Sequence, residues 1–81
     1  DFYADWCMPC KMLSPILEEL SEEIDDVKIV KVNTDKNQEL ASSFGVMSIP
    51  TLLFVKDGKV IDTLVGLRQK EELERVIKSY I

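Results

Sequence analysis

The longest regular pattern of apolar and polar residues predicts an amphipathic helix that begins near Cys7 and runs to Ile24. Apolar side chains recur there at intervals of three or four residues, which places them on one face, and glutamates fall on the opposite face. The apolar positions are Met12, Leu13, Ile16, Leu17, Leu20 and Ile24. Pro9 fits the first turn, where no intrahelical hydrogen bond is lost. Pro15 lies in the interior and predicts a kink.

Four stretches have the composition of β-strands. Residues 1–4 have the pattern of the end of a buried strand, and residues 27–32 are rich in β-branched side chains. Residues 51–56 form a near-continuous apolar run, which predicts a strand covered on both faces. The Asp-Gly pair at 57–58 is a typical hairpin turn and predicts a strand at residues 59–65.

Two further helices complete the pattern. Either Asp35 or Asn37 can cap a short helix that runs to Phe44, and Gly45 is suited to end it. Residues 69–80 predict a final helix, because its apolar side chains share one face. These side chains are Leu73, Val76, Ile77 and Tyr80.

The order of elements predicts an α/β fold. A strand–helix–strand crossover is expected to be right-handed with its two strands parallel, and the hairpin adds two antiparallel strands. The result is a mixed four-stranded sheet with helices on both faces. With 81 residues and no repeat or linker, the chain is expected to form a single domain over residues 1–81.

Composition and charge narrow the function classes. Hydrophobic residues make up 46% and charged residues 31%, an ordinary balance for a soluble globular domain. The net charge of −5, with no histidine, argues against a nucleic-acid-binding protein, which would need a basic face. No apolar run approaches the length of a membrane span, so no membrane partner is expected.

The candidate chemistry lies in Cys7 and Cys10, the only cysteines. At the first turn of a helix, unpaired N–H groups and the helix dipole favour a thiolate, which is the form that attacks disulfides. The pattern therefore predicts thiol–disulfide exchange, and a structural disulfide or two inert thiols are the alternatives. Two thiolates supply only half of a tetrahedral zinc site and the chain has no histidine, so no metal is expected.

Three motifs together resemble the thioredoxin family in order and spacing. They are residues 1–11 (DFYADWCMPCK), residues 48–51 (SIPT) and the Val-Gly pair at 65–66. The resemblance implies a thioredoxin-like fold and a dithiol oxidoreductase that reduces disulfides of client proteins. It also implies a thioredoxin reductase as electron donor and no bound cofactor. The family usually has Gly-Pro between the cysteines, and this chain has Met8 and Pro9, a pair that tunes the redox potential.

Members of the family usually carry a strand and a helix before the point where this sequence begins. The first strand is therefore expected to be truncated, and residues 27–32 to form an unprotected edge of the sheet.

The resemblance also implies a role for individual residues. Cys7, on the exposed side, would attack a client disulfide, and Cys10 would resolve the mixed disulfide. Asp1 matches the buried acid that helps Cys10 lose its proton, and burial should raise its pKa; a frayed, exposed terminus is the alternative. Lys31 matches the lysine near that acid, and an ordinary edge-strand charge is its alternative.

A client-binding surface is implied around Cys7. It consists of Trp6, Met8, Pro9, Ile49, Pro50, Val65 and Gly66. In the family the peptide bond before Pro50 is cis, although the residues alone would favour trans. The backbone of Ile49 would pair with an extended client segment. The alternatives are that Val65 is ordinary core and Gly66 an ordinary turn.

A binding or assembly module on the same fold, without redox turnover, is the rival function. Loss of either cysteine or of Pro50 would favour it, and all three are present. The family's isomerases usually have Gly-His, and glutaredoxins Pro-Tyr, between the cysteines, and neither matches. A cysteine pair of this kind fits a reducing compartment, so we expect a cytoplasmic location, and a signal peptide ahead of the given sequence is the alternative. We also expect a monomer.

Overall fold

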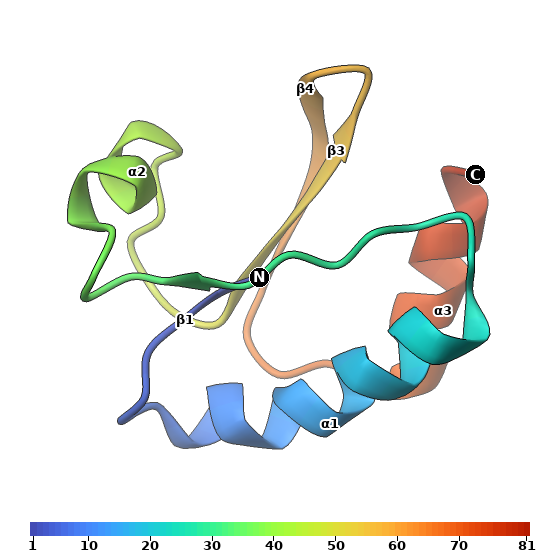
Figure 1. Ribbon diagram of the computed structural model, residues 1–81, viewed down its shortest axis with the longest axis horizontal. Helices are drawn as coiled ribbons and strands as arrows, with labels where there is room; N and C mark the ends of the chain where they lie inside the picture. Colours follow the sequence, from blue (N-terminus) through green and yellow to red (C-terminus); the bar gives the residue numbers. More distant parts are fainter.

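The computed structural model describes residues 1–81 and contains a four-stranded mixed sheet with three helices (Figure 1). The strand order is β2-β1-β3-β4, in which β1 and β2 are parallel and the other neighbours are antiparallel. This confirms the predicted sheet. The elements are β1 (Phe2–Tyr3), α1 (Met8–Glu23), β2 (Val32–Asn33), α2 (Gln38–Ser43), β3 (Thr51–Lys56), β4 (Lys59–Val65) and α3 (Lys70–Ser79).

Helix α1 begins directly after Cys7, which is its N-cap, with proline in the first turn as predicted. The helix continues through Pro15 to Glu23 without a break. Most of its predicted apolar face is buried, with Leu13 and Leu20 at an exposed fraction of 0%, but Met12 is 57% exposed and does not belong to the core. The amphipathic pattern therefore sets both the position and the orientation of α1.

Helices α1 and α3 lie together on one side of the sheet, and α2 lies on the other (Figure 1). The main hydrophobic cluster fills the space between α1, α3 and β3. Its buried members are Leu13, Leu17, Leu20, Ile24, Leu52, Leu73 and Ile77. On the α2 side, the rings of Phe2 and Phe44 are 6.0 Å apart. The prediction of helices on both faces is thus confirmed.

The predicted strand at residues 27–32 is wrong in extent, because only Val32 and Asn33 form β2. The short β1 offers few backbone partners: the Asp1 nitrogen donates to the Val30 carbonyl and the Val32 N–H donates to the Asp1 carbonyl, both at 2.8 Å. Residues before Val30 have no neighbouring strand to form a ladder, and a strand needs one. β2 is nevertheless the edge of the sheet, as expected.

The β3–β4 hairpin has the predicted bounds and turn. Asp57 and Gly58 both have positive φ, +53° and +78°, as a two-residue hairpin loop of this kind requires. The expectation that β3 is covered on both faces is wrong for its second half. Thr51 and Leu52 are buried, but Val55 is 60% exposed, because the helices cover only the beginning of the strand.

The two remaining helices agree with the sequence to within a few residues. Helix α2 follows Asn37, whose side chain makes no capping bond, and it ends before Phe44, with Gly45 at φ +70°. Helix α3 starts after Gln69 and buries Leu73 and Ile77. None of the three helices has the length and apolar character needed to cross a membrane.

Candidate active site at the Cys7–Cys10 pair

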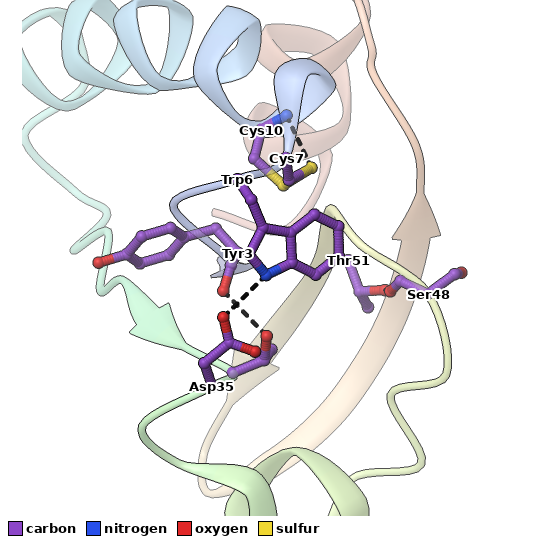
Figure 2. The surroundings of a disulfide bond; sticks show 8 residues. Tyr3, Trp6, Cys7, Cys10, Asp35, Ser48 and Thr51 are labelled. Atoms are coloured by element: carbon purple, nitrogen blue, oxygen red, sulfur yellow. Dashed lines mark hydrogen bonds between the residues drawn. A yellow bond between two sulfur atoms is a disulfide. The ribbon is translucent and has the colours of Figure 1, made fainter.

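Cys7 and Cys10 form a disulfide at the N-terminus of α1, with their Cα atoms 5.2 Å apart (Figure 2). Cys7 has an extended backbone and occupies the N-cap position, so its sulfur lies over the first turn. The backbone N–H of Cys10 donates to the Cys7 Sγ at 3.2 Å. An amide donor and the positive end of the helix dipole both stabilise negative charge on that sulfur when the disulfide is open.

Both cysteines are buried, each with an exposed fraction of 4%. The expectation that Cys7 lies on the exposed side is therefore wrong as a statement about its accessible surface. With Ala4, the two cysteines form a separate small cluster, against which Tyr3 and Ile49 pack. Close packing around the disulfide leaves little of either sulfur open to solvent.

The two cysteines nevertheless differ in what they face. Cys7 lines an open groove of about 510 Å³, and Cys10 does not. We call this the client groove, after the client-binding surface that the family resemblance implies around Cys7. Its lining residues are Trp6, Cys7, Met8, Pro9, Thr34, Ala41, Val46, Met47, Ser48 and Ile49. An incoming sulfur that enters the groove therefore meets Cys7 first.

The client groove joins four of the predicted surface residues, namely Trp6, Met8, Pro9 and Ile49. The sequence analysis missed five others: Thr34, Ala41, Val46, Met47 and Ser48. Three of these directly precede Ile49 in the chain, so their closeness to the SIPT motif at residues 48–51 was a usable signal for them. Thr34 follows β2 and Ala41 lies in α2, and neither carried such a signal. Met47 is 96% exposed and stands at the rim.

Pro50, Val65 and Gly66 lie beside the groove rather than in its lining. The Ile49–Pro50 bond is cis, as the resemblance implied, and Pro50 is fully buried. The Gly66 N–H donates to the Pro50 carbonyl at 2.8 Å, and Val65 pairs with Thr51 in the sheet. Val65 is 48% exposed, so it is not an ordinary core residue.

Trp6 is the most exposed of the aromatic groups near the disulfide, at 69%. Its Nε1–H donates to the Asp35 Oδ2 at 2.8 Å. Figure 2 shows the indole beside the disulfide with its nitrogen turned toward Asp35. The sequence suggested Asp35 only as a helix cap, and its contact with Trp6 depends on the fold.

Asp1 directly precedes β1, and Lys31 directly precedes β2. The Asp1 Oδ1 is buried without a hydrogen-bond partner, which argues against a frayed and exposed terminus. Burial, and secondarily the Lys31 charge, lower the pKa of the Asp1 amino group below 8.0. No ion pair joins the Asp1 carboxylate to Lys31; the Lys31 Nζ instead donates to the Ser14 Oγ at 2.6 Å and lies 5.1 Å from the Tyr3 ring centre.

The family model described as Thioredoxin matches residues 1–79. The chain belongs to the thioredoxin family. It is 56% identical to a thioredoxin of Listeria monocytogenes and 54% identical to one of Bacillus subtilis, covering 80% and 79% of those proteins with its full length. A solved mutant form of a thioredoxin from Halobacterium salinarum superposes with a TM-score of 0.95 at 46% identity, over 99% of this chain and 70% of that one.

Family membership and the Cys7–Cys10 disulfide together make this protein a thioredoxin-type thiol–disulfide oxidoreductase. Thioredoxins act on disulfides of client proteins and are reduced in turn by a reductase partner. The high identity over the whole chain, with both cysteines in place, removes the support for a module without redox turnover.

Proposed function

We propose that Cys7 attacks the client disulfide and that Cys10 resolves the mixed disulfide. The Cys7 thiolate bonds to one client sulfur, and the other client sulfur leaves as a thiolate. The Cys10 thiolate then attacks the Cys7 sulfur, which releases the second client thiolate and forms the Cys7–Cys10 disulfide. Two electrons pass to the client, whose two thiolates take up protons. The observation that carries this assignment is that Cys7 lines the client groove and Cys10 does not.

The second step requires Cys10 to lose its proton, and we assign Asp1 as the acceptor. Its Oδ1 is buried without a partner, and such an oxygen gains by taking up a proton. Lys31 directly precedes β2, which pairs with β1 beside Asp1, so we place its positive charge in the same neighbourhood.

The client segment is proposed to lie across the client groove in an extended form. Ile49 supports this, because neither its N–H nor its carbonyl takes part in a backbone hydrogen bond within the chain. Trp6, Met8 and Pro9 supply the apolar contact on the Cys7 side. Pro50, Val65 and Gly66 flank the segment where it continues past Ile49, and Gly66 allows close backbone approach.

The roles of the cysteines are tested by trapping the intermediate. Cys10→Ser and Cys7→Ser variants are reduced, mixed with insulin and analysed by intact-mass spectrometry without reductant. We expect Cys10→Ser to accumulate a covalent adduct with an insulin chain and Cys7→Ser to form none. Adduct formation by Cys7→Ser alone would reverse the two roles. Turbidity onset with dithiothreitol that is equal in wild type and Cys7→Ser would remove the exchange mechanism.

We further propose a thioredoxin reductase as the electron donor, a monomeric state and a cytoplasmic location. The reductase follows from the family, and the cytoplasm fits the closely spaced redox pair and the bacterial relatives. NADPH consumption with insulin and a bacterial thioredoxin reductase tests the donor. Light scattering after size exclusion tests the monomer, and cell fractionation tests the location.

A further inference from the structure

We infer that Asp35 is a positioning residue: it fixes the Trp6 ring along the client groove and so strengthens the binding of protein clients. The inference rests on the proposed function, in which Trp6 belongs to the client-binding surface. Asp35 does not line the groove and does not contact either sulfur, so its effect must pass through Trp6.

Trp6 needs such a support because little else holds it. The side chain is 69% exposed, so packing alone does not select one orientation of the ring. The bond from Nε1 to the Asp35 Oδ2, at 2.8 Å, is the one hydrogen bond that the indole makes. A carboxylate acceptor makes this a charge-assisted bond, which is stronger than a neutral one.

Asp35 is itself held in place before Trp6 reaches it. The Asn33 Oδ1 accepts the backbone N–H groups of Asp35, at 2.9 Å, and of Lys36, at 3.2 Å. The Asn37 side chain donates to the Asn33 carbonyl at 3.0 Å. These bonds close the loop between β2 and α2 into a fixed turn. The backbone that carries the acceptor for Trp6 is therefore preorganised.

The same loop is tied to the segment that carries the cysteines. The backbone N–H and the Oγ1 of Thr34 both donate to the Tyr3 carbonyl, at 2.8 and 3.1 Å, and the Asn33 Nδ2 donates to the Asp5 Oδ2 at 3.4 Å. Thr34 lines the client groove beside Trp6 (Figure 2 shows the neighbouring Tyr3 and Asp35). The loop therefore fixes two groove-lining residues, Trp6 and Thr34, relative to Cys7.

This arrangement predicts an effect on binding and not on the chemical step. If the Trp6 ring is already ordered before the client binds, no part of the binding free energy is spent on ordering it. Without Asp35 the ring samples other rotamers, and part of the binding free energy is spent in selecting one. The attacking sulfur and its amide donor stay unchanged. A small disulfide, which does not span the groove, should not sense the difference.

The experiment compares three variants of the full chain with wild type. Asp35→Ala removes the acceptor and the charge, Asp35→Asn keeps an oxygen acceptor and removes the charge, and Glu39→Ala removes a nearby exposed charge without touching Trp6. Turnover is measured with fluorescein-labelled insulin and with hydroxyethyl disulfide, both with dithiothreitol as reductant. Because Trp6 is the only tryptophan, fluorescence anisotropy and acrylamide quenching of the oxidised form report on it alone.

We expect Asp35→Ala to raise KM for insulin by about threefold to tenfold, as for the loss of one exposed hydrogen bond. Its kcat and its rate with hydroxyethyl disulfide should stay within about twofold of wild type. The Trp6 anisotropy should fall and quenching should increase. Asp35→Asn should recover most of both effects, and Glu39→Ala should match wild type.

Three results overturn the inference: an unchanged insulin KM in Asp35→Ala, a loss of kcat at constant KM, or equal effects of Asp35→Ala and either of the other variants. Trp6→Phe provides an independent test, because it removes the donor of the hydrogen bond to Asp35. The double variant Trp6→Phe/Asp35→Ala should therefore have the same KM for insulin as Trp6→Phe alone. If wild type itself failed to reduce insulin, the proposed function would fail, whereas the anisotropy comparison would still report on the contact between Asp35 and Trp6.

Discussion

The molecule contains two hydrophobic clusters that differ in size and in purpose. The larger one, between α1, α3 and β3, has seven buried aliphatic residues and no polar side chain among them. The smaller one, at the N-terminus of α1, has only Ala4 and the two cysteines, with Tyr3 and Ile49 packed against it. One helix, α1, connects the two clusters, since its first turn belongs to the small one and its later turns to the large one.

The difference separates stability from chemistry along one helix. Burial of large aliphatic side chains provides most of the stabilisation, so substitutions in the large cluster should unfold the protein. The small cluster buries little area, and it is bordered by hydrogen bonds within the first turn of α1 and from the loop after β2. Substitutions there should change reactivity or client binding and leave the fold largely intact. Of the four predictions that follow, the first two test this division directly, and the other two concern positions outside both clusters.

The largest effect is expected for Cys7→Ser, in the small cluster. Loss of the attacking thiolate should lower insulin reduction by at least about a thousandfold, because a hydroxyl at this site does not ionise near neutral pH. The unfolding free energy should stay within about 1 kcal/mol of that of reduced wild type. Urea denaturation of both reduced proteins provides the comparison. A variant that reduces insulin normally would place the chemistry outside the small cluster.

Leu20→Ala should have the opposite effect to Cys7→Ser: it should lower stability and leave activity largely unchanged. Leu20 is completely buried in the large cluster, and its truncation should lower the unfolding free energy by about 2–5 kcal/mol. The activity of each folded molecule should remain within about twofold of wild type, provided that it is measured below the unfolding transition. Met12→Ala is the matched control: it lies on the same helix but is 57% exposed, and it should cost less than about 0.5 kcal/mol.

Met8→Gly should change the reduction potential of the cysteine pair, and this effect should be smaller than those of the first two substitutions. Met8 occupies the first helical position between the cysteines and is 64% exposed. We expect the reduction potential of the pair to shift by about tens of millivolts, because the intervening residues tune the stability of thiolate and disulfide. Equilibration with glutathione measures it. Met8→Leu is the control, because it keeps the apolar bulk, and its reduction potential should stay near that of wild type. An unchanged potential in Met8→Gly would show that residue 8 is an exposed position with no influence on the redox pair.

The smallest effect is expected for Tyr80→Phe, at the far end of α3. The Tyr80 hydroxyl donates to the Asp62 Oδ2 at 2.7 Å, and this bond, then desolvation and the Asp62 charge, raise the pKa of Tyr80 above 10.0. A raised pKa in the folded state stabilises the protein below pH 10 and loses this contribution as the pH rises through the folded-state value.

Wild type should therefore lose more stability than Tyr80→Phe between about pH 8 and about pH 10.5. Urea midpoints at the two pH values measure the difference, and insulin reduction at neutral pH should be the same in both proteins. An equal loss of stability in both proteins would show that the contact between Tyr80 and Asp62 does not contribute.

The amphipathic periods of the sequence were sufficient to predict much of the fold. The buried face of α1, the β3–β4 hairpin with its turn at residues 57–58 and the parallel pairing of β1 and β2 all agree with the structure. The main error lies at residues 27–32, where β-branched side chains predict a strand that the short β1 cannot pair. Propensity describes one segment, whereas a strand also depends on its neighbour.

For the site, the sequence by itself determined the reacting atoms and their local setting. Cys7 and Cys10 at the start of α1 follow from spacing and helix capping, because both depend on neighbours within one helical turn. Only the tertiary structure decided what surrounds them: that Cys7 lines the client groove and Cys10 does not, that Met47 and Thr34 belong to that groove, and that Asp35 accepts a hydrogen bond from Trp6. The bond between Trp6 and Asp35 joins residues 29 positions apart, and no local pattern encodes a contact over such a separation.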